Sequence, residues 1–168
     1  MTPTNSVMPK IAIIAASGVS ETEMTAIQRA MANIQWRSQV ISPETGLIHS
    51  WADNSWGHCY PADAKMEVSL GSDFDMLILP GGQRHVDKLM ANAHTKRIIG
   101  AMCAMKKPIV AFADGQRMLV ENELMGDNAQ VMTYADAAEL TARAADMAQY
   151  FMDNMPEVHD DEDEQQAA

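Results

Sequence analysis

One segment of the sequence, KKPIVAFADGQRML (residues 106–119), has the pattern of a site that presents a reactive side chain. The run PIVAFA predicts a buried strand, and a Gly-containing turn then leads into an apolar helix pattern. Enzymes use such a strand–turn–helix bend to expose a nucleophile. The residue at this bend is Ala113, and a methyl group has no lone pair with which to attack. The segment therefore predicts the support for a nucleophile without the nucleophile itself.

Polar residues around the bend suggest a second kind of chemistry. Asp114 follows Ala113, while Arg84 and His85 follow a Gly81–Gly82 pair. A carboxylate and an imidazole within hydrogen-bond reach can carry out general acid–base catalysis. Alternatively, Asp114 caps the helix that begins beside it, and the other two are solvated loop residues. The sequence leaves both interpretations open.

Alternating strands and helices must position these residues. The predicted strands are residues 10–16, 37–42, 76–79, 108–113 and 129–134. The predicted helices are residues 20–34, 86–106, 115–124 and 136–155. Because the strands are apolar on both faces, we expect an α/β fold with a mostly parallel sheet between two helical layers. Residues 43–70 contain turn residues between short β-like pieces and predict a small β-hairpin excursion.

The loops at the carboxyl ends of three strands should form any site, because ligands of such sheets bind there. These loops are residues 15–21, 79–85 and 111–116. Ser20 and Glu23 in the first loop could belong to a pocket. Their spacing also fits a capping box, in which Ser20 begins the helix.

Composition narrows the class of protein. A chain of 168 residues suits one domain, which we place at residues 10–156, between a loose leader (1–9) and an acidic, disordered tail (157–168). The net charge of −11 argues against nucleic-acid and anionic-membrane partners. No segment reaches the length of a membrane span or of a secretory leader, and the chain needs no disulfide, so a cytoplasmic location is expected.

The predicted hairpin region holds further reactive side chains. His49 and His58 suggest a metal, but no paired ligand motif accompanies them, so no metal and no cofactor are predicted. Cys59 lies in the same region, whereas Cys103 lies among apolar residues and should be buried and inert. If either thiol senses oxidants, it is Cys59. The tryptophans at 51 and 56 predict a small satellite core or a subunit contact.

Two segments, DMLILPGG and KKPIVAFADGQRML, resemble corresponding segments of the PfpI/ThiJ superfamily, the class I glutamine amidotransferase-like proteins. The resemblance implies that Ala113 stands at the position of the family's cysteine nucleophile and Asp114 at that of its histidine. It places the family's acidic residue at Ser20. It also implies that Gly115 of the elbow is kept, as are Gly81 and Gly82, whose amides can stabilise an oxyanion.

A second resemblance comes from GVSETEM and AQVMTYADAAELTARAADMAQYF, which are similar to the flavodoxin-like C-terminal domain of large-subunit catalases. In that domain the elbow cysteine is also absent, and the domain carries out no peroxide chemistry. The resemblance implies a flavodoxin-like three-layer sandwich with a stabilising or assembly role and no haem.

We therefore expect a non-catalytic protein of this superfamily, a stress-related binding or chaperone-like module that forms a homodimer and holds a protein client or a small molecule. One alternative is an enzyme without a cysteine nucleophile, of hydrolase, glyoxalase or deglycase type, that uses Asp114 and His85. Another alternative is a small-molecule sensor that keeps the cleft without the chemistry.

Overall fold

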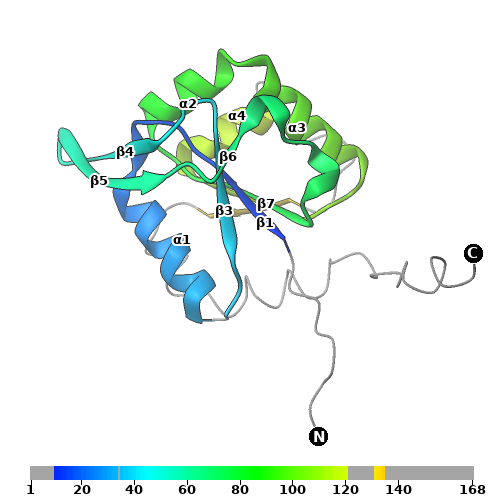
Figure 1. Cartoon of the computed structure of the whole chain (residues 1–168), viewed down its shortest axis with the longest axis horizontal. Coiled ribbons are helices and arrows are strands. Elements are labelled where there is room, and N and C mark those ends of the chain that lie inside the picture. Colours follow the sequence, from blue (N-terminus) through cyan, green and yellow to red (C-terminus); the bar gives the residue numbers. More distant parts are fainter. Residues whose placement is uncertain (1–9, 34, 121–130, 135–168) are drawn as a thin grey trace, which may run out of the picture.

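The computed structural model describes residues 10–33, 35–120 and 131–134 (Figure 1). The six strands of its main sheet are β1 (Ile11–Ile14), β3 (Ser38–Ser42), β6 (Ala64–Lys65), β7 (Met76–Leu79), β8 (Ile109–Phe112) and β9 (Val131–Tyr134). The helices are α1 (Glu21–Asn33), α2 (Gln83–Met90), α3 (Ala93–Ala104) and α4 (Arg117–Val120), with 3₁₀ turns η1 (Met66–Val68), η2 (Gly71–Asp73) and η3 (Ala113–Gln116).

The strand order is β6-β3-β1-β7-β8-β9, and every pair in this sheet is parallel. Without the two-residue edge strand β6, this is the strand order of flavodoxin-like folds. The chain changes direction across the sheet at β1, which has β3 on one side and β7 on the other. Ligands of such sheets bind beside this switch point, at the carboxyl ends of the strands.

Alternate residues of each buried strand pack into two separate cores. Ile11 and Ile13 of β1 join Met24 and Ile27 of α1 on one face of the sheet. Ala12 and Ile14 join the residues of α2, α3 and α4 on the other face. Figure 1 shows α1 on one side of the sheet and the green helices on the other. The predicted flavodoxin-like α/β sandwich is therefore confirmed.

The predicted excursion is a single β-hairpin within a second, smaller sheet. Strand β2 (Val19–Ser20) pairs in parallel with β4 (Leu47–Ala52), which pairs antiparallel with β5 (Ser55–Pro61). Asp53 and Asn54 form the tip, with φ of +50° and +60°. Two consecutive left-handed residues are typical of the tight turns that match strand twist, and Asp and Asn tolerate this backbone well. In Figure 1 the hairpin projects away from the main sheet.

Some predicted boundaries need correction. The helix predicted over residues 86–106 begins earlier, at Gln83, and is interrupted after Met90. The interruption occurs because the Asn92 side chain accepts a hydrogen bond from the His94 amide (2.9 Å) and starts a new helix, α3. The predicted helix over residues 136–155, the leader and the acidic tail lie outside the described residues. Within the described residues, no helix is both long and apolar enough to cross a membrane.

Candidate functional site

The bend after β8 has the backbone geometry that the sequence predicted. Ala113 has φ of +42°, in the left-handed region that residues with a Cβ rarely occupy, at a cost of about 1 kcal/mol. Gly115 makes the bend tight, because a Cβ on this residue would lie 2.3 Å from the carbonyl oxygen of Leu79. Ala113 and Asp114 are both exposed. The elbow therefore presents a methyl group to solvent from a strained backbone position.

Two hydrogen bonds lock the loop after β1 to the loop after β7. The amide of Ser20 donates to the carbonyl oxygen of Gly81 (2.9 Å), and the amide of Gly81 donates to Oε2 of Glu23 (3.0 Å). Ser20 Oγ also accepts from the Glu23 amide (3.4 Å), so the N-cap half of the predicted capping box is confirmed. The Glu23 carboxylate does not complete the box, because it turns to Gly81 instead.

The resemblance placed the family's acidic position at Ser20, and the structure shows a different acidic residue beside the elbow. Ser20 is the cap of α1, whereas the buried carboxylate beside the elbow belongs to Glu23, which is 6% exposed. A Cβ built on Gly81 would lie 2.6 Å from Oε2 of Glu23 and 3.2 Å from the Cβ of Ala113. Glu23 and Ala113 thus contact the same side of Gly81, and the helical turn that follows the cap brings Glu23 there.

The same contact alters the role expected of the Gly81 amide. An oxyanion hole needs amide donors that are free to receive developing negative charge. The Gly81 amide already donates its single N–H to the Glu23 side chain, so it is not free for a second acceptor. Gly81 therefore supports the floor of the site instead of offering the donor that the resemblance implied.

His85 holds the backbone together and does not pair with Asp114 as hypothesised. Its side chain is completely buried, its Nδ1 accepts from the Ala16 amide (3.3 Å), and its Nε2 donates to the carbonyl oxygen of Pro80 (2.6 Å). Burial lowers the pKa of His85 from its ordinary value of 6.5 to about 4, although the hydrogen bond to Pro80 opposes the shift. Both ring nitrogens are thus committed to the backbone, and the imidazole is neutral at pH 7.

The β4–β5 hairpin supplies a wall that the sequence did not predict. The guanidinium carbon of Arg84 lies 4.1 Å from the ring centroid of Trp51 on β4, a cation–π contact. The Trp51 ring in turn meets Trp56 on β5 edge-on, with centroids 4.9 Å apart. The two tryptophans therefore contact each other, but Trp56 is 53% exposed, so they form an exposed aromatic pair beside Arg84 and not a buried satellite core.

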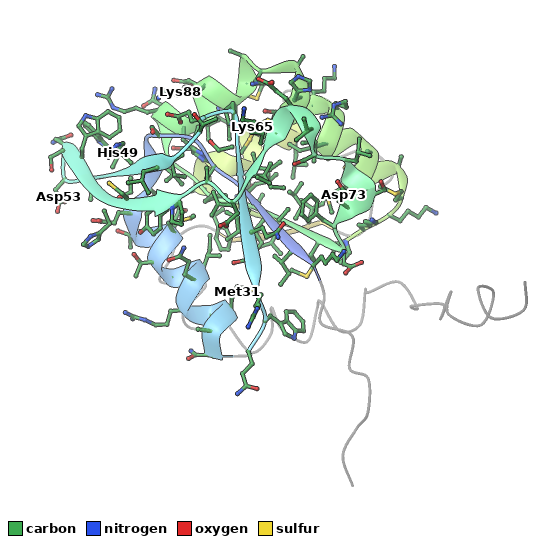
Figure 2. All side chains as sticks on the ribbon, in the orientation of Figure 1. Met31, His49, Asp53, Lys65, Asp73 and Lys88 are labelled. Carbon is green, nitrogen blue, oxygen red and sulfur yellow. The ribbon has the colours of Figure 1, made fainter. Side chains whose placement is uncertain are left out.

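These elements enclose a cleft of about 810 Å³ above the elbow. It is lined by Gly18, Ser20, Glu21, Thr22, Glu23, Trp51, Ala52, Asp53, Asn54, Gly82, Gln83, Arg84, Ala113 and Asp114. Figure 2 shows the labelled Asp53 at the outer end of the hairpin. Within the described residues, the lining carries four carboxylates (Glu21, Glu23, Asp53, Asp114) and one guanidinium (Arg84). The cleft is therefore polar and bears a negative formal charge.

The structure brings most of the predicted site residues together. Those lining the cleft are Ser20, Glu23, Gly82, Arg84, Ala113 and Asp114. Gly81 and Gly115 are buried close by, and His85 does not line the cleft. Sequence reasoning missed Glu21, Trp51, Asp53 and Asn54. The aromatic residues of the hairpin were a signal for the last three, but no sequence pattern tells where a hairpin folds.

The hairpin histidines form no recognisable metal centre. His58 lies 3.5 Å from Oε1 of Glu21, and its amide donates to the same oxygen (2.8 Å). His49 instead contacts Cys59. Among residues 10–33, 35–120 and 131–134, no group of three or more His, Cys, Asp or Glu side chains is arranged to hold a metal ion.

The strand order, the helices on both faces and the elbow at the end of β8 define an α/β protein of the DJ-1-like, flavodoxin-like class. The family model described as the DJ-1/PfpI family matches residues 9–161. The chain therefore belongs to the DJ-1/PfpI family. A comparison with curated proteins finds no match.

Solved structures with the same fold include oxidised Toxoplasma gondii DJ-1, which has a TM-score of 0.73 at 16% identity, covering 87% of this chain and 93% of that one. Schizosaccharomyces pombe DJ-1 has a TM-score of 0.66 at 12% identity, covering 83% and 90%. An Anabaena variabilis protein with DJ-1/ThiJ/PfpI-like and ferritin-like domains has a TM-score of 0.72 at 17% identity, covering 83% and 49%. At these identities the likeness shows the shared fold.

Proposed function

We propose that this chain is a non-catalytic member of the DJ-1/PfpI family that binds a small polar molecule in the cleft above Ala113. The proposal rests mainly on one observation: the elbow residue that lines the cleft, Ala113, carries only a methyl group. The neighbouring Gly81 amide, which donates to the Glu23 carboxyl group, adds to it. Acyl transfer needs an activated nucleophile and free oxyanion donors at this place. Here the methyl group replaces the nucleophile, and a carboxylate occupies one of the donors.

The cleft itself supports binding. Its volume of about 810 Å³ lies within the range of small-molecule sites in proteins. Its walls are rigid, because the loops after β1 and β7 are hydrogen-bonded to each other and Trp51 stacks against Arg84. A purely structural role would favour a closed elbow, whereas Ala113 and Asp114 are exposed. The carboxylates of the lining favour a neutral or cationic polar ligand over an anionic one.

A ligand-observed NMR experiment tests the proposal. The full chain is mixed with sets of polyols, sugars, nucleosides and amines, and saturation transfer to each compound is recorded. The same sets are measured with Ala113→Met. The added side chain extends into the cleft, and the backbone already accommodates a Cβ at this position, so the strain should not increase.

The expected result is binding of at least one neutral or cationic compound by the natural chain, with affinity weakened by about tenfold or more in Ala113→Met. Retention of a compound with equal affinity by both proteins would place its site elsewhere. If neither protein binds any compound while the fold is intact, the binding proposal fails.

The resemblance to the C-terminal domain of large-subunit catalases supports a role within an assembly, such as a stress-related or chaperone-like module. Homodimerisation and a cytoplasmic location belong to the same proposal. The exposed side chains of Val68 and Leu70 offer apolar surface that a second copy could cover. Sedimentation of the full chain as a monomer at micromolar concentration would overturn the dimer.

A further inference from the structure

The hairpin brings a thiol and an imidazole into direct contact outside the elbow cleft. His49 on β4 and Cys59 on β5 are paired directly across the antiparallel strands. Cys59 Sγ lies 3.1 Å from Nδ1 of His49, and both residues are exposed. Directly opposed residues of an antiparallel pair project from the same face, so the register of the hairpin fixes this contact.

This contact matters because the thiolate is the nucleophilic form of cysteine. An isolated cysteine side chain is only a few per cent thiolate at pH 7. An imidazole in hydrogen-bond contact can take the proton, either before or during attack on an electrophile. Cys103 offers an internal comparison, because it is half-buried on α3 and packs against the core beneath that helix.

A cavity lies against the other partner of the pair. It measures about 440 Å³ and is lined by Ser17, His49, Trp56 and Lys88. None of these residues lines the cleft above Ala113. Figure 2 labels His49 on the hairpin and Lys88 on α2, the elements on either side of the cavity.

The lining of this cavity carries one charged side chain, the ammonium group of Lys88. The backbone amide of Ser17, another lining residue, donates to the Glu44 carboxylate (2.5 Å). The Trp56 ring meets His49 edge-on, with centroids 6.3 Å apart. The cavity thus offers an indole surface beside one ammonium group, which suits a small organic molecule without positive charge.

We propose that Cys59 and His49 form a second reactive site, at which the thiol is alkylated by small, uncharged carbon electrophiles. The Cys59 S–H proton passes to Nδ1 of His49 while a sulfur lone pair forms an S–C bond. The bond between that carbon and its leaving group breaks, and the leaving group departs with the electron pair as an anion. His49 then releases the proton to solvent. The site is independent of the cleft above Ala113, so it does not rest on the proposed binding function.

Iodoacetamide is the probe that tests this site. The full, folded chain is treated with it between pH 5.5 and 9, and alkylation of each cysteine is followed by peptide mass spectrometry. At pH 7, Cys59 should react about tenfold faster than Cys103 and about tenfold faster than the thiol of glutathione. Below pH 8 its rate should fall less steeply with pH than the glutathione rate, because His49 accepts the proton.

Two variants separate activation from exposure. His49→Asn should slow the alkylation of Cys59 at pH 7 by about tenfold, because the side-chain amide is not a base. His58→Asn is the matched control, since His58 neighbours Cys59, is 80% exposed and bonds to Glu21 instead. It should leave the rate unchanged.

Equal rates for the natural chain and His49→Asn would overturn the proposal, as would a Cys59 rate no greater than that of Cys103. If His49→Asn lowers the thermal midpoint of unfolding, the pH dependence of Cys59 alkylation in the natural chain is used to test the proposal instead. A profile parallel to that of glutathione would then exclude activation by His49.

Discussion

The elbow at Ala113 and the β4–β5 hairpin differ in how a constrained backbone and reactive side chains are combined. At the elbow, a strained backbone and closely packed glycines hold one side chain in a defined place, and that side chain is a methyl group. On the hairpin, a thiol meets an imidazole at 3.1 Å on an exposed pair of strands. The first region has the support without the reactive group, and the second has reactive groups on a simple support.

Different interactions maintain the elbow geometry and the thiol–imidazole contact. The elbow is held by its neighbours, since Gly115 packs under Leu79 and the loops of Ser20 and Gly81 are hydrogen-bonded together. A methyl group at the elbow is therefore compatible with the strained backbone. The Cys59–His49 contact needs only the correct register of two strands, which the turn at Asp53 and Asn54 and the register shift between Trp51 and His49 set together.

The largest effect should come from filling the space under the elbow. Gly115→Ala would place a Cβ 2.3 Å from the Leu79 carbonyl oxygen, a backbone atom that cannot move aside easily. We expect a loss of about 3 kcal/mol or more in the free energy of unfolding, measured by urea denaturation.

Gly46→Ala is the control for that substitution. Gly46 has φ of +82°, but a Cβ there would meet nothing within 4 Å. It should cost about 1 kcal/mol, from backbone strain alone. Equal losses for the two variants would show that close packing does not hold the elbow.

The next largest effect concerns His85 and pH. Its pKa of about 4 in the folded chain is below the ordinary 6.5, so the unfolded chain binds the proton more tightly. Stability is then unaffected above pH 6.5 and falls as pH drops toward 4, by about 3 kcal/mol in total. His85→Gln should remove that part of the pH dependence, as seen in urea unfolding at pH 7 and pH 4.5. Parallel pH profiles for both proteins would mean that folding does not lower the pKa of His85.

A smaller effect should link the cleft wall to the hairpin. The Arg84–Trp51 contact should contribute about 1 kcal/mol, which a double-mutant cycle with Arg84→Met and Trp51→Leu would measure. A coupling energy of zero would indicate that the Arg84–Trp51 contact does not hold the hairpin against the elbow cleft.

The smallest effect is expected at the elbow residue itself. Ala113→Gly removes left-handed strain but gives the unfolded chain more freedom, so we expect a net gain of about 0.5 kcal/mol. The matched change at an exposed helical position, Ala32→Gly on α1, should lose a similar amount. Thermal unfolding of the two variants should therefore show midpoints shifted in opposite directions, upward for Ala113→Gly and downward for Ala32→Gly. A clear loss in Ala113→Gly would show that the methyl group packs productively in the cleft.

The sequence predicted the sheet well, because its strands are uniformly apolar and bounded by turn residues. The strand at residues 76–79 was predicted with its observed bounds. The elbow was also predictable, since a strand, a small residue and Gly115 form a local pattern. The interruption between α2 and α3 was missed, because Asn92 is a strong cap only where the chain bends.

The site was predicted less completely, since its contacts join residues that are far apart in the sequence. The resemblance placed the acidic position at Ser20, whereas the carboxyl group that reaches Gly81, 58 residues away, belongs to Glu23. His85 was a catalytic candidate by residue type, and only its burial and its bonds to Ala16 and Pro80 show a structural role. The hairpin wall depends on tertiary packing that no local pattern encodes.

The most direct test of the central claim is a turnover assay of the natural chain. Purified protein is incubated with small esters, amides and α-oxoaldehydes, and products are quantified by mass spectrometry. Because the elbow carries a methyl group and the Gly81 amide is already bound, we predict no turnover above the rate in buffer. Turnover that Asp114→Asn abolishes would contradict this account.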